Sequence, residues 1–149
     1  MFDLSSLNPQ QREAVTHKNG SLLLLAGAGS GKTRVITCRI AHLLQQGGKA
    51  EEILAVTFTN KAAREMRERV QEMVGRRATT GMTIATFHSL GVRILKKDID
   101  RLGFKKNFSI YAAADQQRLI RDLLREIGAK NSSTDADQVL WRISSAKNH

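Results

Sequence analysis

Eight consecutive residues near the N-terminus combine small side chains with one lysine and one threonine. They are Ala26, Gly27, Ala28, Gly29, Ser30, Gly31, Lys32 and Thr33. Small residues let successive backbone N–H groups point inward, where they can surround phosphate oxygens. The Lys32 ammonium suits the β- and γ-phosphates of a nucleoside triphosphate such as ATP, and the Thr33 hydroxyl suits Mg²⁺. The sequence therefore predicts a phosphate-binding loop in which Lys32 and Thr33 are catalytic and Thr33 is the metal ligand.

The elements around this loop must hold it in place. The continuously apolar stretch 21–26 predicts a strand buried on both faces, and the apolar spacing of residues 33–46 predicts a helix. That helix would direct the positive end of its dipole at the phosphates. The pattern is the Walker A motif, except that Ala26 replaces the usual first glycine. A glycine-rich turn without a ligand is the alternative, and the strand–loop–helix context disfavours it.

Helices and strands alternate through residue 86. Asn8, Pro9 and Gln11 predict a helix start in which Asn8 and Gln11 cap each other. Further strands are predicted over residues 53–58 and 82–86, and further helices over residues 60–74 and 89–102. This alternation favours an α/β domain with parallel strands.

The pattern changes after residue 110. Residues 115–127 and 134–147 predict two amphipathic helices around a polar loop at 130–133, with no strand between them. We therefore expect one domain over residues 1–110 and a helical one over residues 111–149.

The charge balance indicates a polyanionic partner. The chain has 24 lysines and arginines against 14 aspartates and glutamates, a net charge of +10. Basic groups release counterions from a phosphate backbone, although a merely soluble basic surface would give the same balance. The densest apolar run, residues 22–25, is too short to span a membrane, and the single cysteine, Cys38, is typical of a reducing compartment. We expect a cytoplasmic protein with no membrane partner.

Four segments, in order, resemble the UvrD/Rep/PcrA-type DNA helicases of superfamily 1. They are residues 7–15, 26–34, 57–63 and 86–88, and a looser likeness continues to residue 148. The resemblance implies a P-loop NTPase of RecA-like fold, a partial parallel sheet flanked by helices, followed by the start of an all-α inserted subdomain. It implies ATP and Mg²⁺ as cofactors, single-stranded and duplex DNA as partners, and 3′ to 5′ unwinding in bacterial DNA repair or replication near the nucleoid.

The resemblance assigns two more residues to the nucleotide. Gln11 matches a glutamine whose amide reads the adenine edge, for which an amide offers both a donor and an acceptor. Capping of its own helix is the alternative role of Gln11. Arg34 follows the loop where the family places an arginine near the nucleotide, and a surface salt bridge is its alternative role.

The resemblance also assigns DNA contacts to two strand ends. Thr57, Phe58, Thr59 and Asn60 match motif Ia, and Thr86, Phe87 and His88 match motif Ib, both of which lie under single-stranded DNA in the family. Phe58 offers a face for base stacking, and Thr59 and Asn60 offer phosphate contacts. The alternatives are a core position for Phe58, a helix cap for Asn60 and a structural role for His88.

Other charged and aromatic residues are assigned ordinary roles. The helix over 60–74 is expected to be a solvated face with i,i+4 charge pairs, because Lys61, Arg64, Arg67 and Arg69 alternate with Glu65, Glu68 and Glu72. Pairs at 76–77 and 96–97 are candidates for nonspecific phosphate contact. Trp141 is expected to pack in a core, and contact with a nucleic-acid base is its alternative role.

The sequence contains no apolar run followed by an Asp-Glu pair, the Walker B feature that holds Mg²⁺ and positions water. We therefore expect an N-terminal fragment of an ATP-dependent helicase that binds nucleotide, hydrolyses it poorly and self-associates through exposed apolar surface. Two alternatives are a P-loop NTPase that does not act on nucleic acid and a non-enzymatic DNA-binding module with a vestigial P-loop.

Overall fold

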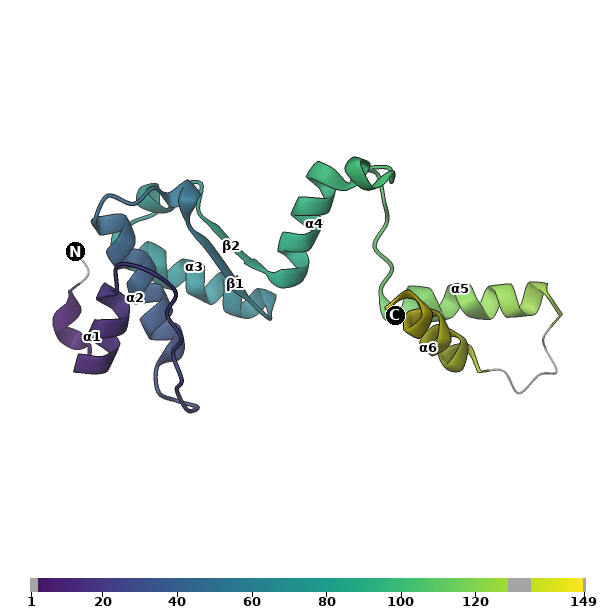
Figure 1. Ribbon diagram of the computed structural model, residues 1–149, viewed down its shortest axis with the longest axis horizontal. Coiled ribbons are helices and arrows are strands. Elements are labelled where there is room, and N and C mark those ends of the chain that lie inside the picture. Colours follow the sequence, from purple (N-terminus) through teal and green to yellow (C-terminus); the bar gives the residue numbers. More distant parts are fainter. Residues whose placement is uncertain (1–2, 129–134, 149) are drawn as a thin grey trace. The chain divides into compact units, whose positions relative to one another are not determined.

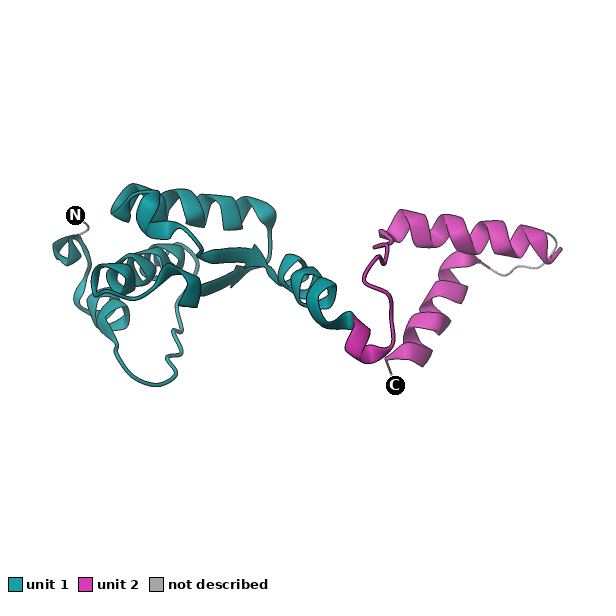
Figure 2. Ribbon diagram, turned by 90° about the horizontal axis from the view of Figure 1, so that it is seen from above, with its two compact units in different colours: residues 1–99 teal, residues 100–149 magenta. Residues whose placement is uncertain are grey.

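A computed structural model describes residues 3–128 and 135–148 of the chain. The chain divides into two compact units, residues 1–99 and residues 100–149 (Figure 2). None of the described helices is both long and apolar enough to cross a membrane. The predicted boundary at residue 110 lies inside the second unit.

The first unit has an α/β architecture (Figure 1). Its elements are α1 (Pro9–Thr16), α2 (Lys32–Gln45), β1 (Leu54–Thr57), α3 (Asn60–Val74), β2 (Thr83–Thr86) and α4 (Phe87–Asp98), with 3-10 turns at Leu4–Ser6, Ala50–Glu52 and Arg77–Thr79. The two strands pair in parallel, with Leu54 opposite Thr83 and Thr57 opposite Thr86. Parallel pairing requires a crossover, which α3 supplies. The predicted α/β class and the parallel pairing are confirmed, and both strands end level with each other.

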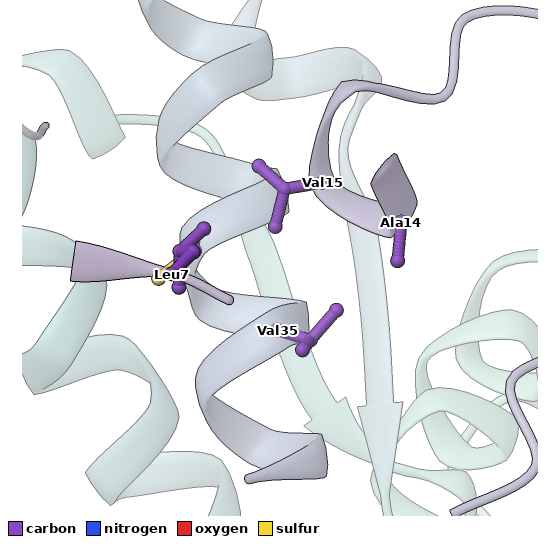
Figure 3. Close-up of a cluster of buried hydrophobic side chains, with 5 residues drawn as sticks. Leu7, Ala14, Val15 and Val35 are labelled. Carbon is purple, nitrogen blue, oxygen red and sulfur yellow. The ribbon is translucent and has the colours of Figure 1, made fainter. Parts of the chain in front are cut away.

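The first of two core clusters joins α1 to α2. Its buried residues are Leu7, Ala14, Val15, Val35 and Cys38, the first four of which are labelled in Figure 3. Val15 is fully buried. Burial also raises the pKa of the Cys38 thiol above its ordinary value, so Cys38 is a neutral core residue rather than a reactive thiolate. This cluster fixes α1 beside α2, the helix that follows the predicted phosphate-binding loop.

The second core cluster joins α2 and α3 to the sheet. Ala63, Met66 and Val70 are spaced by three and four residues, so they share one face of α3 and are buried with Ile40 of α2 and Ile84 of β2. The helix that carries the loop and the helix that follows β1 therefore belong to one packed body.

The strand predicted over residues 21–26 is wrong. The segment lies outside any helix or strand, and no described strand pairs with it. Leu22 and Leu24 are 41% and 42% exposed, whereas Leu23 and Leu25 are 80% and 89% exposed. A strand needs ladder partners for its backbone groups, and an apolar run cannot supply them by itself.

The second unit is a helical pair with little core. The 3-10 turn Ile99–Leu102 leads to α5 (Ala113–Glu126) and α6 (Ala136–Lys147). Among its described residues only Ala136 is buried, and Gln117 Nε2 donates to Asp137 Oδ1 at 2.7 Å to link the two helices. Both predicted helices are confirmed, while the polar loop at 130–133 lies outside the described residues.

The core position predicted for Trp141 is wrong. Its side chain is 71% exposed beside the charged and amide groups of Asp137, Gln138 and Arg142. Its neighbours Val139 and Leu140 are half-buried instead, and two helices alone offer too little surface to enclose a tryptophan as well.

Candidate nucleotide site and nucleic-acid interface

The predicted phosphate-binding loop, residues 26–33, contains two glycines with left-handed backbone angles. Gly29 has φ +75° and Gly31 has φ +85°, and Gly31 is the N-cap of α2. The backbone angle of Gly31 favours glycine, and a Cβ there would lie 3.1 Å from Nε2 of Gln11, so it would also displace the Gln11 amide slightly. No side chain caps α2, which leaves the amide groups of its first turn free to bind an anion.

The Lys32 side chain is hydrogen-bonded to the backbone of the loop. Its Nζ donates to the carbonyl oxygens of Ala26 at 3.0 Å and Gly27 at 2.5 Å. The Ser30 hydroxyl donates to the same Gly27 oxygen at 2.8 Å. Because the ammonium already has two acceptors, a phosphate group would have to compete with these carbonyls for it. Thr33, the next residue of α2, is exposed.

The Gln11 side chain connects α1 to the loop. Its Oε1 accepts from the Asn8 backbone N–H at 3.3 Å, and the Gln11 backbone N–H donates to Asn8 Oδ1 at 2.8 Å, which confirms the predicted capping box. Its Nε2 donates to the Ser30 carbonyl at 3.2 Å. Capping and loop contact therefore occur together, and the adenine contact remains a prediction.

A hollow of about 300 Å³ lies between α1 and the loop. Its polar lining residues are Asn8, Gln10, Gln11, Ser30 and Lys32, and its apolar lining residues are Ala14, Leu24, Leu25, Ala26 and Val35. The apolar lining was missed from the sequence because the leucine run was interpreted as a buried strand. A long-range signal would have been needed to place these leucines beside α1.

Arg34 does not line this hollow. Its Nη2 donates to the carbonyl oxygen of Ser6 at 3.1 Å and to the Ser6 hydroxyl at 3.0 Å. It therefore ties α2 to the N-terminal turn. Among the described residues it has no carboxylate partner, so the salt-bridge alternative is wrong, and the predicted position near the nucleotide stays a prediction.

The two strands end in matching Thr-Phe pairs. Thr57 and Thr86 lie opposite each other, and Phe58 and Phe87 follow them. The two rings have centroids 5.5 Å apart and planes 46° apart. Phe58 is 86% exposed and Phe87 is 52% exposed, so the core alternative for Phe58 is wrong. The exposed aromatic pair lies at the carboxyl edge of the sheet, where open α/β sheets bind ligands.

Threonines cap the helices that follow the strands. Thr59 Oγ1 accepts from the Ala62 N–H at 3.1 Å, and Thr86 Oγ1 accepts from the Ser89 N–H at 3.1 Å. Asn60 is the first residue inside α3, so the cap alternative for Asn60 is wrong. His88 is exposed on the first turn of α4, which does not favour a buried structural role.

We expect Thr86→Ala to lower the free energy of unfolding by about 1 kcal/mol, because it removes a buried helix cap. Thr86→Ser keeps the capping oxygen and should retain most of that stability. Urea unfolding followed by circular dichroism measures both variants. Equal losses for alanine and serine would mean that the methyl group, not the cap, stabilises this site.

A family model described as UvrD/REP helicase N-terminal domain matches residues 7–149. This chain belongs to that family. It is 54% identical to the ATP-dependent DNA helicase PcrA of Bacillus subtilis over 97% of this chain, and 47% identical to PcrA of Staphylococcus aureus (strain Mu50 / ATCC 700699) over the same share. It is 48% identical to the ATP-dependent DNA helicase Rep of Escherichia coli over 95% of this chain. The chain spans about a fifth of the length of these relatives (20% of each PcrA and 21% of Rep).

In this helicase N-terminal domain, α3 carries fewer charge pairs than predicted. Lys61 and Glu65, 4.0 Å apart, form the single ion pair on this helix. Arg67 donates instead to the Ile84 carbonyl at 2.7 Å, because the open edge of β2 leaves that oxygen without a strand partner. The prediction of a face laced with pairs is therefore wrong. The basic pairs at 76–77 and 96–97 are exposed.

Proposed function

We propose that this chain is the nucleotide-binding N-terminal part of the first RecA-like motor domain of a bacterial ATP-dependent DNA helicase. Residues 1–110 would form part of the P-loop domain, and residues 111–149 would begin the helical inserted subdomain. Membership of the helicase N-terminal domain family and similarity to the ATP-dependent DNA helicases PcrA and Rep support this proposal. The parent enzyme would unwind duplex DNA 3′ to 5′ in repair or replication, in the cytoplasm near the nucleoid.

The observation that carries the proposal is the convergence of Gln11, Ala26, Ser30 and Lys32 on one hollow. ATP would place its adenine beside the Gln11 amide and its phosphates against the amide groups of residues 27–33. The uncapped N-terminus of α2 fits an anion, and Lys32 would neutralise the β- and γ-phosphates.

Magnesium fits the same site. Mg²⁺ is commonly held by one or two protein groups together with phosphate oxygens and water. The exposed Thr33 hydroxyl, in the first turn of α2, would be the protein ligand. When bound, the ion would supply positive charge that stabilises the phosphates during transfer to water.

Single-stranded DNA would cross the carboxyl edge of the sheet. Bases would stack on the exposed rings of Phe58 and Phe87, and Thr59, Asn60 and His88 would contact the backbone. Ile40 of α2 and Met66 of α3 are buried in one cluster, which supports a rigid link between the nucleotide loop and this edge.

The 149 residues by themselves would bind nucleotide but turn it over slowly. They contain no Asp-Glu pair after an apolar run, and the carboxylates of such a pair normally hold Mg²⁺ and position water. Leu23 and Leu25 are exposed apolar surface through which the chain would self-associate.

We expect the chain to bind both Mg·ATP and a fluorescent oligo-dT, and DNA affinity should fall steeply with salt, by roughly 0.7 log units per log unit of salt for each phosphate contacted. Calorimetry measures the nucleotide and anisotropy measures the DNA. A P-loop NTPase that does not act on nucleic acid would bind ATP alone. A DNA-binding module with a vestigial loop would bind DNA alone, and either outcome would reject the proposal.

A further inference from the structure

A second hollow, of about 290 Å³, lies within the first unit between α3, β2 and α4. Three arginines line it, Arg64 and Arg67 from α3 and Arg93 from α4, together with the polar side chains of Asn60, Thr86 and Ser89. None of the described residues that line it carries a carboxylate. Its electrostatic character is therefore that of an anion site.

The three guanidinium groups have no acidic partner among the described residues. The single ion pair of α3 joins Lys61 to Glu65, and Arg93 has none. Arg67 is held in place by its bond to the Ile84 carbonyl at 2.7 Å, which uses one of its five N–H donors and leaves the others available. One guanidinium group can bind two oxygens of a phosphate at once, because two of its N–H donors match the spacing of the two oxygens.

A hydroxyl group adds a further donor. Thr86 Oγ1 accepts from the Ser89 N–H and donates to the Ser89 Oγ at 2.9 Å. The Ser89 oxygen thus has an internal donor, and its own proton has no acceptor among the described residues. Three guanidinium groups and a hydroxyl form a donor set suited to a tetrahedral oxyanion.

We propose that this arginine pocket, defined by Arg64, Arg67, Arg93 and Ser89, binds one phosphate group. The group is either a phosphodiester of a nucleic-acid strand or a free phosphate. Thr86 lines the pocket and directly precedes Phe87, so a strand stacked on the aromatic pair would pass close to it. The assignment of this phosphate to a nucleic-acid strand rests on the proposed function, whereas phosphate binding by the pocket does not.

The test compares two charge-matched double variants of the 149-residue chain. Arg64→Gln/Arg93→Gln removes two pocket guanidinium groups and keeps Arg67, which also bonds β2. Arg69→Gln/Arg121→Gln removes the same charge from exposed residues outside the pocket. Circular dichroism and urea unfolding establish that both variants fold.

The first measurement uses the unmodified chain and does not depend on whether the variants fold. Inorganic phosphate is titrated into the unmodified chain at constant ionic strength, with chloride as the reference, and arginine side-chain N–H signals are followed by NMR. We expect the signals of Arg64, Arg67 and Arg93 to shift together and that of Arg69 to stay. Equal shifts for all exposed arginines, or none, would overturn the proposal.

The second measurement identifies the source of the phosphate. Removing Arg64 and Arg93 should weaken oligo-dT binding about tenfold at low salt, because hydrogen bonds to a charged group are lost. It should also lower the salt slope by roughly 0.7, the value for one phosphate of a single strand. The control double variant should keep the slope.

The outcomes separate this inference from the proposed function. Signal shifts with unchanged oligo-dT binding would assign the pocket to free phosphate. In a second outcome, the unmodified chain binds oligo-dT, phosphate shifts no arginine signal, and both double variants have the same oligo-dT affinity. That outcome would reject the pocket and leave the DNA-binding function intact. Phosphate shifts without any oligo-dT binding would support the pocket and reject the DNA-binding function.

Discussion

Lys32→Ala is expected to weaken Mg·ATP binding by roughly ten- to a hundredfold, because a charge-assisted hydrogen bond to the β- and γ-phosphates contributes about 1.5–3 kcal/mol. The loss of ATP affinity should be smaller than for a lysine whose ammonium has no hydrogen-bond acceptors before ATP binds. Lys32 Nζ already donates to the Ala26 and Gly27 carbonyls, and ATP must replace those bonds before it gains its own. Isothermal titration calorimetry with Mg²⁺ present measures the change.

Two controls isolate the role of Lys32. Lys18→Ala removes the same charge from an exposed residue outside the hollow and should leave ATP affinity unchanged. AMP lacks the β- and γ-phosphates, so its affinity should change little in Lys32→Ala. An unchanged ATP affinity in Lys32→Ala would show that the loop does not hold the triphosphate, and the site assignment would fail.

Features that depend on neighbours in the sequence were predicted well. The capping box of Asn8 and Gln11 forms because its two partners lie three residues apart, so no distant contact is needed. The strands β1 and β2 and helix α3 follow from local periodicity and glycine or threonine boundaries. Local signals also predicted strands ending at residues 58 and 86, within one residue of the observed ends at Thr57 and Thr86, which parallel pairing brings level.

Features that depend on a distant partner were predicted poorly. Residues 21–26 have the composition of a buried strand, but a strand forms only where another strand accepts its hydrogen bonds. Arg67 has glutamates nearby on its helix, yet it bonds the Ile84 carbonyl, seventeen positions away in sequence. Both errors arise because local sequence patterns show which residues are close along the chain but not which distant residues are in contact in the fold.

Gln11 illustrates why alternatives in a sequence need not exclude one another. A primary amide has an acceptor oxygen and two N–H donors. In the structure the oxygen accepts from Asn8 and one N–H donates to Ser30, so one side chain serves both the cap and the loop. The remaining N–H and the second lone pair of the oxygen are the groups that an adenine edge would use.

Phe58→Ala is expected to weaken oligo-dT binding by roughly five- to a hundredfold, because stacking of one base on an aromatic ring contributes about 1–3 kcal/mol. The free energy of unfolding should fall by less than about 1 kcal/mol, since the ring is 86% exposed and its aromatic contact is Phe87. Anisotropy measures the affinity, and urea unfolding measures the stability.

Phe58→Tyr keeps a ring for stacking and should bind oligo-dT within about twofold of the unmodified chain, since phenol and phenyl faces stack alike. Phe104→Ala removes a ring that is 66% exposed in the second unit and should leave affinity unchanged. The pair of controls separates base stacking from general loss of apolar surface. If Phe58→Ala and Phe104→Ala weakened oligo-dT binding equally, DNA bases would not stack on the aromatic residues at the strand ends. A large loss of stability in Phe58→Ala, with DNA affinity intact, would instead return this residue to a packing role, and the carboxyl edge of the sheet would lose its assigned ligand.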